Sequence, residues 1–105
     1  MSEELLRDFY LGFIRIHILH HACQGAVFGL ELMEELGRHG YTVGAGTLYP
    51  ILHALEEKGF LSSQRQTVGG KVRRYYRATP LGERVLMEAS RQAGEMLREI
   101  TEATS

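Results

Sequence analysis

The organisation of the chain is clearest in residues 46–82, which read GTLYPILHALEEKGFLSSQRQTVGGKVRRYYRATPLG. The first part predicts a helix from about Thr47 to Lys58, because apolar residues recur there at three- and four-residue spacings. These residues are Leu48, Ile51, Leu52 and Leu55. Pro50 falls in the first turn, where its missing N–H costs little, and Gly59 is a typical stop signal.

A hairpin and a further helix follow in the same stretch. Two strand-like segments, Phe60–Val68 and Lys71–Ala78, flank the pair Gly69–Gly70, which is a two-residue hairpin signal. Thr79–Pro80 then predicts a helix start, with threonine as the N-cap and proline at the first helical position. We expect this last helix to run to about residue 103.

Working outward toward the N-terminus, hydrophobic periodicity predicts two more helices. The first runs from Glu3 to about His21, and the second from about Val27 or Gly29 to Arg38. In the second helix we expect the inward residues to be Leu30, Met33 and Leu36, together with Val27 if the helix begins there. A short extended segment at 41–43 and a turn at 44–46 lead into the helix at 47–58. The fold class is therefore mainly α with a small β-hairpin: a winged helix-turn-helix, with the third helix as recognition helix and the hairpin as wing.

Composition narrows the function classes. The chain has 105 residues, enough for one small domain, with 44% apolar and 24% charged residues. A single cysteine fits a reducing cytoplasmic setting, and no apolar run reaches the roughly 18 to 20 residues of a membrane span. Asp8 is the only aspartate, and no nucleophile–base–acid set or phosphate loop is present. We therefore expect no enzyme and no cofactor.

The net charge of −1 conceals a strong asymmetry. Residues 58–82 hold six basic residues and no acidic one, whereas the remainder holds six basic and all 13 acidic residues. The chain is thus +6 over the hairpin region and −7 elsewhere. A wing that lies along the DNA backbone needs exposed lysine and arginine side chains to contact the phosphates.

Two helices carry more apolar surface than one small domain can cover. The first helix is apolar over an unusually wide face that includes Phe9, Tyr10 and Phe13. The last helix repeats apolar residues at heptad a and d positions: Leu86, Ala89, Ala93, Met96 and Ile100. We expect both helices at a dimer interface. The predicted division is a DNA-binding winged helix over 1–79, with helix 3–21 also at the interface, and a dimerisation helix over 80–105.

The stretch 46–59 and the run Gly69–Gly70–Lys71–Val72–Arg73–Arg74–Tyr75–Tyr76, followed by Thr79–Pro80–Leu81–Gly82, resemble the PadR family of transcriptional regulators. The chain departs from the family pattern at Val72, where proline is frequent. It is similar to the short subgroup with one C-terminal helix. The resemblance implies a homodimeric repressor that binds palindromic double-stranded operator DNA and is often released by a small aromatic or hydrophobic effector.

Candidate DNA contacts come from the recognition helix and the wing. They are Gly46, Thr47, Tyr49, His53, Lys71, Arg73, Arg74 and Tyr75. We expect Thr47 to cap its helix or to offer its N–H to a phosphate, and Lys71 and Arg73 to contact the DNA backbone. Arg74 should point the opposite way, toward the body of the domain or an acidic neighbour. Of the adjacent tyrosines, we expect Tyr76 in the core.

Two alternatives stay open. One is a winged-helix protein-interaction module without DNA binding. The other is a metal- or redox-sensing regulator that uses the cluster His17, His20, His21 and Cys23 near the end of the first helix, where histidines at i, i+3 and i, i+4 can share an ion. We interpret this cluster first as a polar helix end, and we predict no metal ligand.

Overall fold

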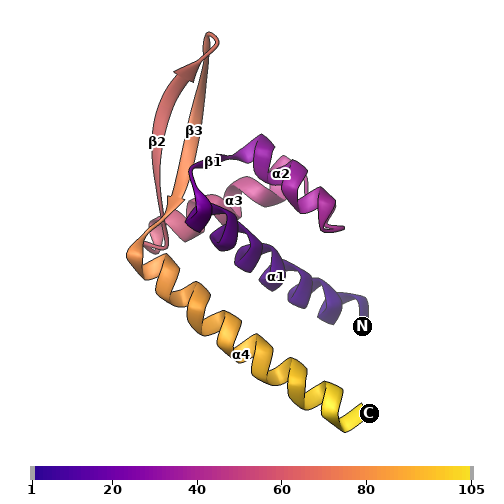
Figure 1. Ribbon diagram of the computed structural model, residues 1–105. Coiled ribbons are helices and arrows are strands. Elements are labelled where there is room, and N and C mark those ends of the chain that lie inside the picture. Colours follow the sequence, from indigo (N-terminus) through magenta and orange to yellow (C-terminus); the bar gives the residue numbers. More distant parts are fainter. Residues whose placement is uncertain (1, 105) are drawn as a thin grey trace.

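A computed structural model describes residues 2–104. The elements in chain order are α1 (Ser2–Gln24), β1 (Val27–Phe28), α2 (Gly29–Arg38), α3 (Ala45–Glu57), β2 (Leu61–Val68), β3 (Lys71–Ala78) and α4 (Pro80–Thr104). The hairpin of β2 and β3 projects from one end of the helical body, and α4 runs antiparallel to α1, so that both termini lie at the same end (Figure 1). The predicted winged helix-turn-helix, mainly α with a small sheet, is confirmed.

The wing is a regular antiparallel ribbon. Leu61 lies opposite Ala78 and Val68 opposite Lys71, with no bulge between them. Gly69 and Gly70 make the turn with φ of +57° and +79°, a left-handed pair that a two-residue hairpin needs and that only glycine adopts without cost. The hairpin prediction is therefore confirmed at both strands and at the turn.

A third strand was not predicted. Val27 and Phe28 pair antiparallel with Tyr76 and Tyr75, which gives the sheet order β1-β3-β2. Two residues are too few for a periodicity signal, so the sequence pattern extended the second helix back toward Val27. The pairing matters for the site because it fixes the base of the wing directly before α2 begins at Gly29.

The core lies between α1, α2, α3 and the base of the sheet. Its fully buried side chains are Ile14, Ile18, Leu32, Leu36, Leu48, Leu52, Leu61 and Tyr76. The expectation for Tyr76 is confirmed. The expectation for Leu30 is wrong: its side chain is 57% exposed, and Leu32 is buried in its place. Because α2 starts at Gly29 after a strand, Leu32 and Leu36 are buried on the face that it turns to the core, and Met33 packs against that core partly buried.

Backbone caps fix how the elements meet. Phe60 N–H donates to the Leu55 carbonyl and Gly59 N–H to the Glu56 carbonyl, which is the paired pattern of a Schellman cap closed by a left-handed residue. The Thr79 hydroxyl donates to the Gly59 carbonyl at 2.6 Å and accepts from the Gly82 N–H at 3.0 Å. The predicted N-cap of α4 is confirmed, and it also ties the start of α4 to the end of α3.

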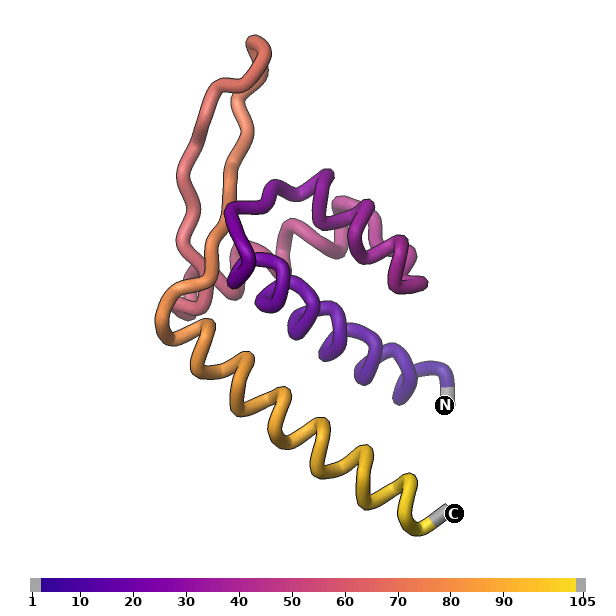
Figure 2. Tube along the Cα trace, in the orientation of Figure 1, coloured from indigo at the N-terminus to yellow at the C-terminus, as the bar shows by residue number. Residues whose placement is uncertain are grey.

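The molecule is elongated for its size. Its radius of gyration is 15.3 Å, against about 13 Å for a compact domain of this length. The tube in Figure 2 shows why: the wing and the distal half of α4 both extend beyond the helical body. Residues on α4 from Ser90 onward are exposed wherever their side chains are described.

Candidate nucleic-acid interface

One face of α3 is left free by the core. Gly46, Tyr49 and His53 follow each other at helical spacing and are all exposed, while Leu48 and Leu52 point inward. The first turn of α3 is uncovered as well, since a Cβ added at Gly46 would meet nothing within 4 Å. The structure therefore presents the predicted recognition-helix residues together on one accessible surface.

The expectation that Thr47 caps its helix is wrong. The helix begins at Ala45, and Gly44 holds the N-cap position in an extended conformation without a side-chain cap. The Thr47 N–H donates to the Gly44 carbonyl at 3.1 Å, so it is not directed at a ligand. The predicted turn at 44–46 is likewise the first turn of the helix, because a glycine N-cap leaves no side-chain signal in the sequence.

Tyr49 packs beside the start of α2. Its ring contacts Gly29 so closely that a Cβ at that position would overlap the phenol carbons, and 38% of the residue remains exposed. Together with Phe28, Leu30 and the wing, it lines a cleft of about 240 Å³ that also receives Lys71, Val72, Arg73 and Arg74. Residues from the recognition helix and from the wing thus border the same depression.

Alternation along β3 separates the cations of the wing onto two faces. Lys71, Arg73, Tyr75 and Arg77 occupy one face, and Val72, Arg74 and Tyr76 the other. Lys71 is exposed at the tip. The Arg73 guanidinium carbon lies 4.5 Å from the centre of the Phe28 ring, and Phe28 also meets Tyr75 edge to face at 5.4 Å. Arg73 is therefore oriented by β1 rather than free, and Tyr75 is partly covered.

Arg74 turns inward, as the alternation predicts. Its Nη1 lies 3.7 Å from Glu56 Oε1 and donates to Ser63 Oγ at 3.2 Å, and Ser63 in turn donates to Glu56 Oε2 at 2.6 Å. This network joins the middle of the wing to the last turn of α3. Among the described residues, Arg74 is thus the one cation of the predicted DNA-binding set that forms an ion pair.

Three further basic residues of the stretch 58–82 are exposed, and the sequence did not indicate a role for them. They are Lys58, Arg65 and Arg77. Arg65 lies directly opposite Arg74 in the ladder, and Arg77 shares the face of Lys71 and Arg73. The strand register assigns Arg65 and Arg77 to faces of the ribbon, whereas Lys58 is the C-cap of α3.

The predicted interface residues fall into three groups. Phe9, Phe13, Met96 and Ile100 are each about half exposed or more, and Ala93 is exposed beside them. Leu86 and Ala89 are partly buried where α4 meets α1. Tyr10 behaves differently: its hydroxyl donates to the Thr42 carbonyl at 3.3 Å and its ring meets Tyr41 at 4.9 Å, so it packs within its own chain.

The histidine and cysteine cluster is rearranged relative to the sequence prediction. Cys23 is an exposed free thiol whose pKa is raised by burial of the sulfur and then by Glu83, which is the opposite of the activation that a redox-sensing cysteine needs. The close group in the structure is His17, His21 and His39, without His20 or Cys23. His39 is distant in sequence, so spacing alone did not indicate it.

No helix within residues 2–104 is long and apolar enough to cross a lipid bilayer. The exposed face of α3, the cation-bearing wing and the cleft between them form the candidate interface. Its geometry is that of a winged helix, in which one helix enters the major groove and the wing follows the backbone.

Comparison with known proteins agrees with this geometry. Residues 18–88 match the model of the transcriptional regulator PadR-like family. The chain is 50% identical over 95 residues to the transcriptional regulator Rv3488 of Mycobacterium tuberculosis, covering 90% of this chain and 89% of that protein.

Solved structures show the same fold. A PadR family transcriptional regulator from Eggerthella lenta DSM 2243 superposes with a TM-score of 0.84 at 29% identity, covering 99% of this chain and 92% of that one. The protein smu.1704 of Streptococcus mutans UA159 gives 0.76 at 29% identity, with coverage of 83% and 81%. This chain therefore belongs to the PadR-like family of transcriptional regulators, and it is a DNA-binding regulator rather than an enzyme.

Proposed function

We propose that the protein is a homodimeric repressor that binds a palindromic operator through two winged helices. The observation that carries the proposal is the basic wing standing beside the exposed face of α3, on a chain whose other charges are predominantly acidic. Two copies double the basic surface, while the total charge stays near zero. A twofold protein presents two recognition helices related by that axis, so the sequence it reads is palindromic.

Dimerisation is supported by apolar surface that one chain leaves uncovered. On α1 this surface consists of Leu5, Leu6, Phe9 and Phe13; on α4 it includes Met87, Met96, Leu97 and Ile100. Contiguous apolar surface of this kind marks an interface in a soluble protein. The two helices are adjacent and antiparallel (Figure 1), so a second copy can bury both stripes at once.

In the proposed dimer, some residues contact the DNA and another holds the wing in position. Tyr49 and His53 on α3 face the major groove and supply contacts to base edges or phosphates, with Gly46 allowing close backbone approach. Lys71 at the wing tip and Arg73 behind it contact phosphates or the minor groove. Arg74 holds the wing to α3 through Glu56 and so acts on binding indirectly.

The effector site of this proposal is the groove between α1 and α4. It has a volume of about 530 Å³ and is lined by Phe13, Ile16, His17, His20, Leu86, Met87, Ala89, Ser90 and Ala93. Its walls are largely aliphatic and aromatic, which suits a small aromatic or hydrophobic molecule. A ligand there lies between the two helices of the proposed interface, and it changes the spacing of the two winged helices.

The test is an electrophoretic mobility shift with duplexes from the region upstream of the protein's own coding sequence, across a salt series. We expect a specific shift that weakens steeply with salt, and a dimer by sedimentation. Absence of a shift with any duplex at low salt overturns the DNA-binding proposal and leaves the protein-interaction module. Native mass spectrometry of freshly purified protein tests for a co-purified effector.

A further inference from the structure

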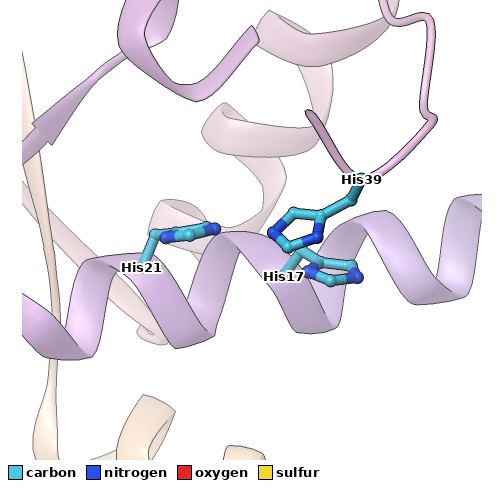
Figure 3. A group of neighbouring side chains, drawn as sticks. All are labelled: His17, His21 and His39. Carbon is cyan, nitrogen blue, oxygen red and sulfur yellow. The ribbon is translucent and has the colours of Figure 1, made fainter. Parts of the chain in front are cut away.

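Three histidines from two separate helices converge on one point. His17 and His21 lie one turn apart on α1, and His39 closes the end of α2. Each can offer one ring nitrogen such that all three nitrogens lie within 4.8 Å of one another. Figure 3 shows the His39 ring lying over His17, with the His21 ring directed toward both.

The backbone holds this arrangement. His39 is the C-cap of α2, and the next two residues close the helix by donating Gly40 N–H to the Gly37 carbonyl and Tyr41 N–H to the Leu36 carbonyl, a Schellman cap. The His39 ring stacks on His17 with the ring centres 4.6 Å apart. The i, i+4 spacing on α1 places His17 and His21 on the same helix face.

Two buried polar atoms beside the cluster lack a partner among the described residues. His21 Nε2 and Glu31 Oε1 are both inaccessible and make no hydrogen bond within residues 2–104. A buried nitrogen lone pair or N–H without a partner is costly and calls for an explanation, of which a bound ion is one. Glu31 and Glu35 both act electrostatically on His21, so carboxylates that can balance a cation are close by.

The protonation state suits metal binding. Burial lowers the pKa of His17, and the neighbouring His39, His21 and His20 lower it further. Burial also lowers the pKa of His21, although Glu35 opposes the shift. A neutral imidazole is the form that binds a metal, and both shifts are in the direction that favours this form.

We propose that His17, His21 and His39 bind one divalent transition-metal ion of the zinc class. Imidazole nitrogens select zinc, nickel, copper or cobalt over the oxygen-preferring magnesium and calcium, and the absence of a thiolate from this set separates it from copper(I) sites. Zinc–nitrogen bonds of about 2.0 to 2.1 Å place tetrahedral ligands about 3.3 Å apart. Small rotations of the partly exposed rings bring the nitrogens that close. Water completes the coordination, because the group of ligand atoms that lie within 4.8 Å of one another contains only the three histidines.

The consequence would be a bridge between two functional parts of the molecule. Helix α1 carries the exposed apolar stripe and one wall of the groove, and His17 itself lines that groove. Helix α2 precedes α3 in the helix-turn-helix. An ion held by both helices would fix the C-terminal end of α2 against α1, so that metal binding would stabilise the domain and set the position of the helix-turn-helix relative to the interface.

The test uses untagged full-length protein stripped with a chelator and titrated calorimetrically with Zn²⁺, and with Co²⁺, whose visible absorption reports nitrogen ligation. We expect one site per chain and a higher melting temperature with Zn²⁺. Removing ligands with His39→Gln or His17→Gln should weaken Zn²⁺ binding about 10-fold or more and abolish the thermal shift. His53→Gln, which removes an exposed histidine on α3, is the matched control for the metal titration alone, and its Zn²⁺ affinity should equal that of the wild type.

Equal Zn²⁺ affinity in wild type and His39→Gln would overturn the proposal, as would an equal loss in His53→Gln. Because His39 is an exposed residue at a helix end, its substitution should leave the fold intact, and the circular dichroism of the metal-free variant checks this. DNA binding by the metal-free protein is a separate outcome, so failure of the metal site leaves the proposed function standing.

Discussion

Removing Lys71 and Arg73 together tests whether the wing contacts DNA. Both side chains lie on the same face of β3, on the side away from the Arg74–Glu56 pair. Neither side chain forms an ion pair within the described residues 2–104, although Arg73 lies over the Phe28 ring. In Lys71→Ala/Arg73→Ala we expect weaker binding to every duplex and a shallower dependence of affinity on salt, because phosphate contacts carry no sequence information.

The size of the change follows from counting charges. In a dimer the double variant removes four cations, and each phosphate contact on B-DNA contributes about 0.9 to the slope of log affinity against log salt. The slope should therefore fall by about 3.6 when both side chains reach phosphates. It should fall by about 1.8 when only Lys71 does and Arg73 stays on Phe28. The two single variants separate these cases.

The assay is fluorescence anisotropy with a labelled duplex over a series of salt concentrations. The control is Arg38→Ala/Arg91→Ala, which removes the same charge from two exposed arginines that pair with Glu35 and Glu88 on their own helices. An unchanged slope in the wing variant would refute its role in phosphate contact. A matching decrease in the control would show that net charge, rather than the position of the wing, governs binding.

Four further substitutions test the rest of the structure. Met96→Glu places a charge on the exposed face of α4 and should yield monomers in sedimentation equilibrium; a persistent dimer would contradict the interface. Gly82→Ala should lower stability by about 1–3 kcal/mol in thermal melts, because its Cβ would overlap the Phe60 carbonyl, whereas Gly94→Ala, where the Cβ meets nothing within 4 Å, should raise it by up to about 1 kcal/mol; equal melting of the two would contradict this packing. Arg74→Ala should cost below about 1 kcal/mol, since its ion pair is partly exposed, and should change the salt slope less than Lys71→Ala does.

Elements with strong local signals were predictable from the sequence. The hairpin has its glycine pair, α4 has its Thr–Pro start and α3 has its leucine stripe, and all three lie within a residue or two of their predicted bounds. The incorrect predictions concern positions at which tertiary contacts determine the secondary structure or the burial of a side chain. Val27 and Phe28 pair with β3 instead of forming the first turn of α2. As a result, Leu32 is buried and Leu30 is exposed. The N-cap of α3 is Gly44 rather than Thr47. Sequence reasoning missed Gly44 because a glycine N-cap has no side-chain signature.

In the candidate sites, too, the features with a local sequence pattern were predictable and those set by tertiary contacts were not. Strand alternation predicted the opposite directions of Arg73 and Arg74, since a period of two needs no tertiary information. The sequence contained no sign of the Phe28 ring beneath Arg73, because β1 itself was not expected. His39 was missed as a partner of His17 and His21 for a related reason: it lies 18 residues beyond His21, and only the packing of α2 on α1 brings them together.

Arg73 and Arg74 are adjacent in sequence but make different contacts. The contacts of Arg74 connect the wing to α3. Arg74 connects β3 to Glu56 in the last turn of α3, with Ser63 of β2 bonded to both. Arg73, one residue earlier, faces outward against Phe28 at the start of α2. The wing is thus attached at its middle to the end of α3 and at its side to the start of α2. A change in the angle between α2 and α3 therefore alters the position of Lys71 and Arg73 relative to α3, so the two parts of the candidate interface depend on how α2 packs against α3.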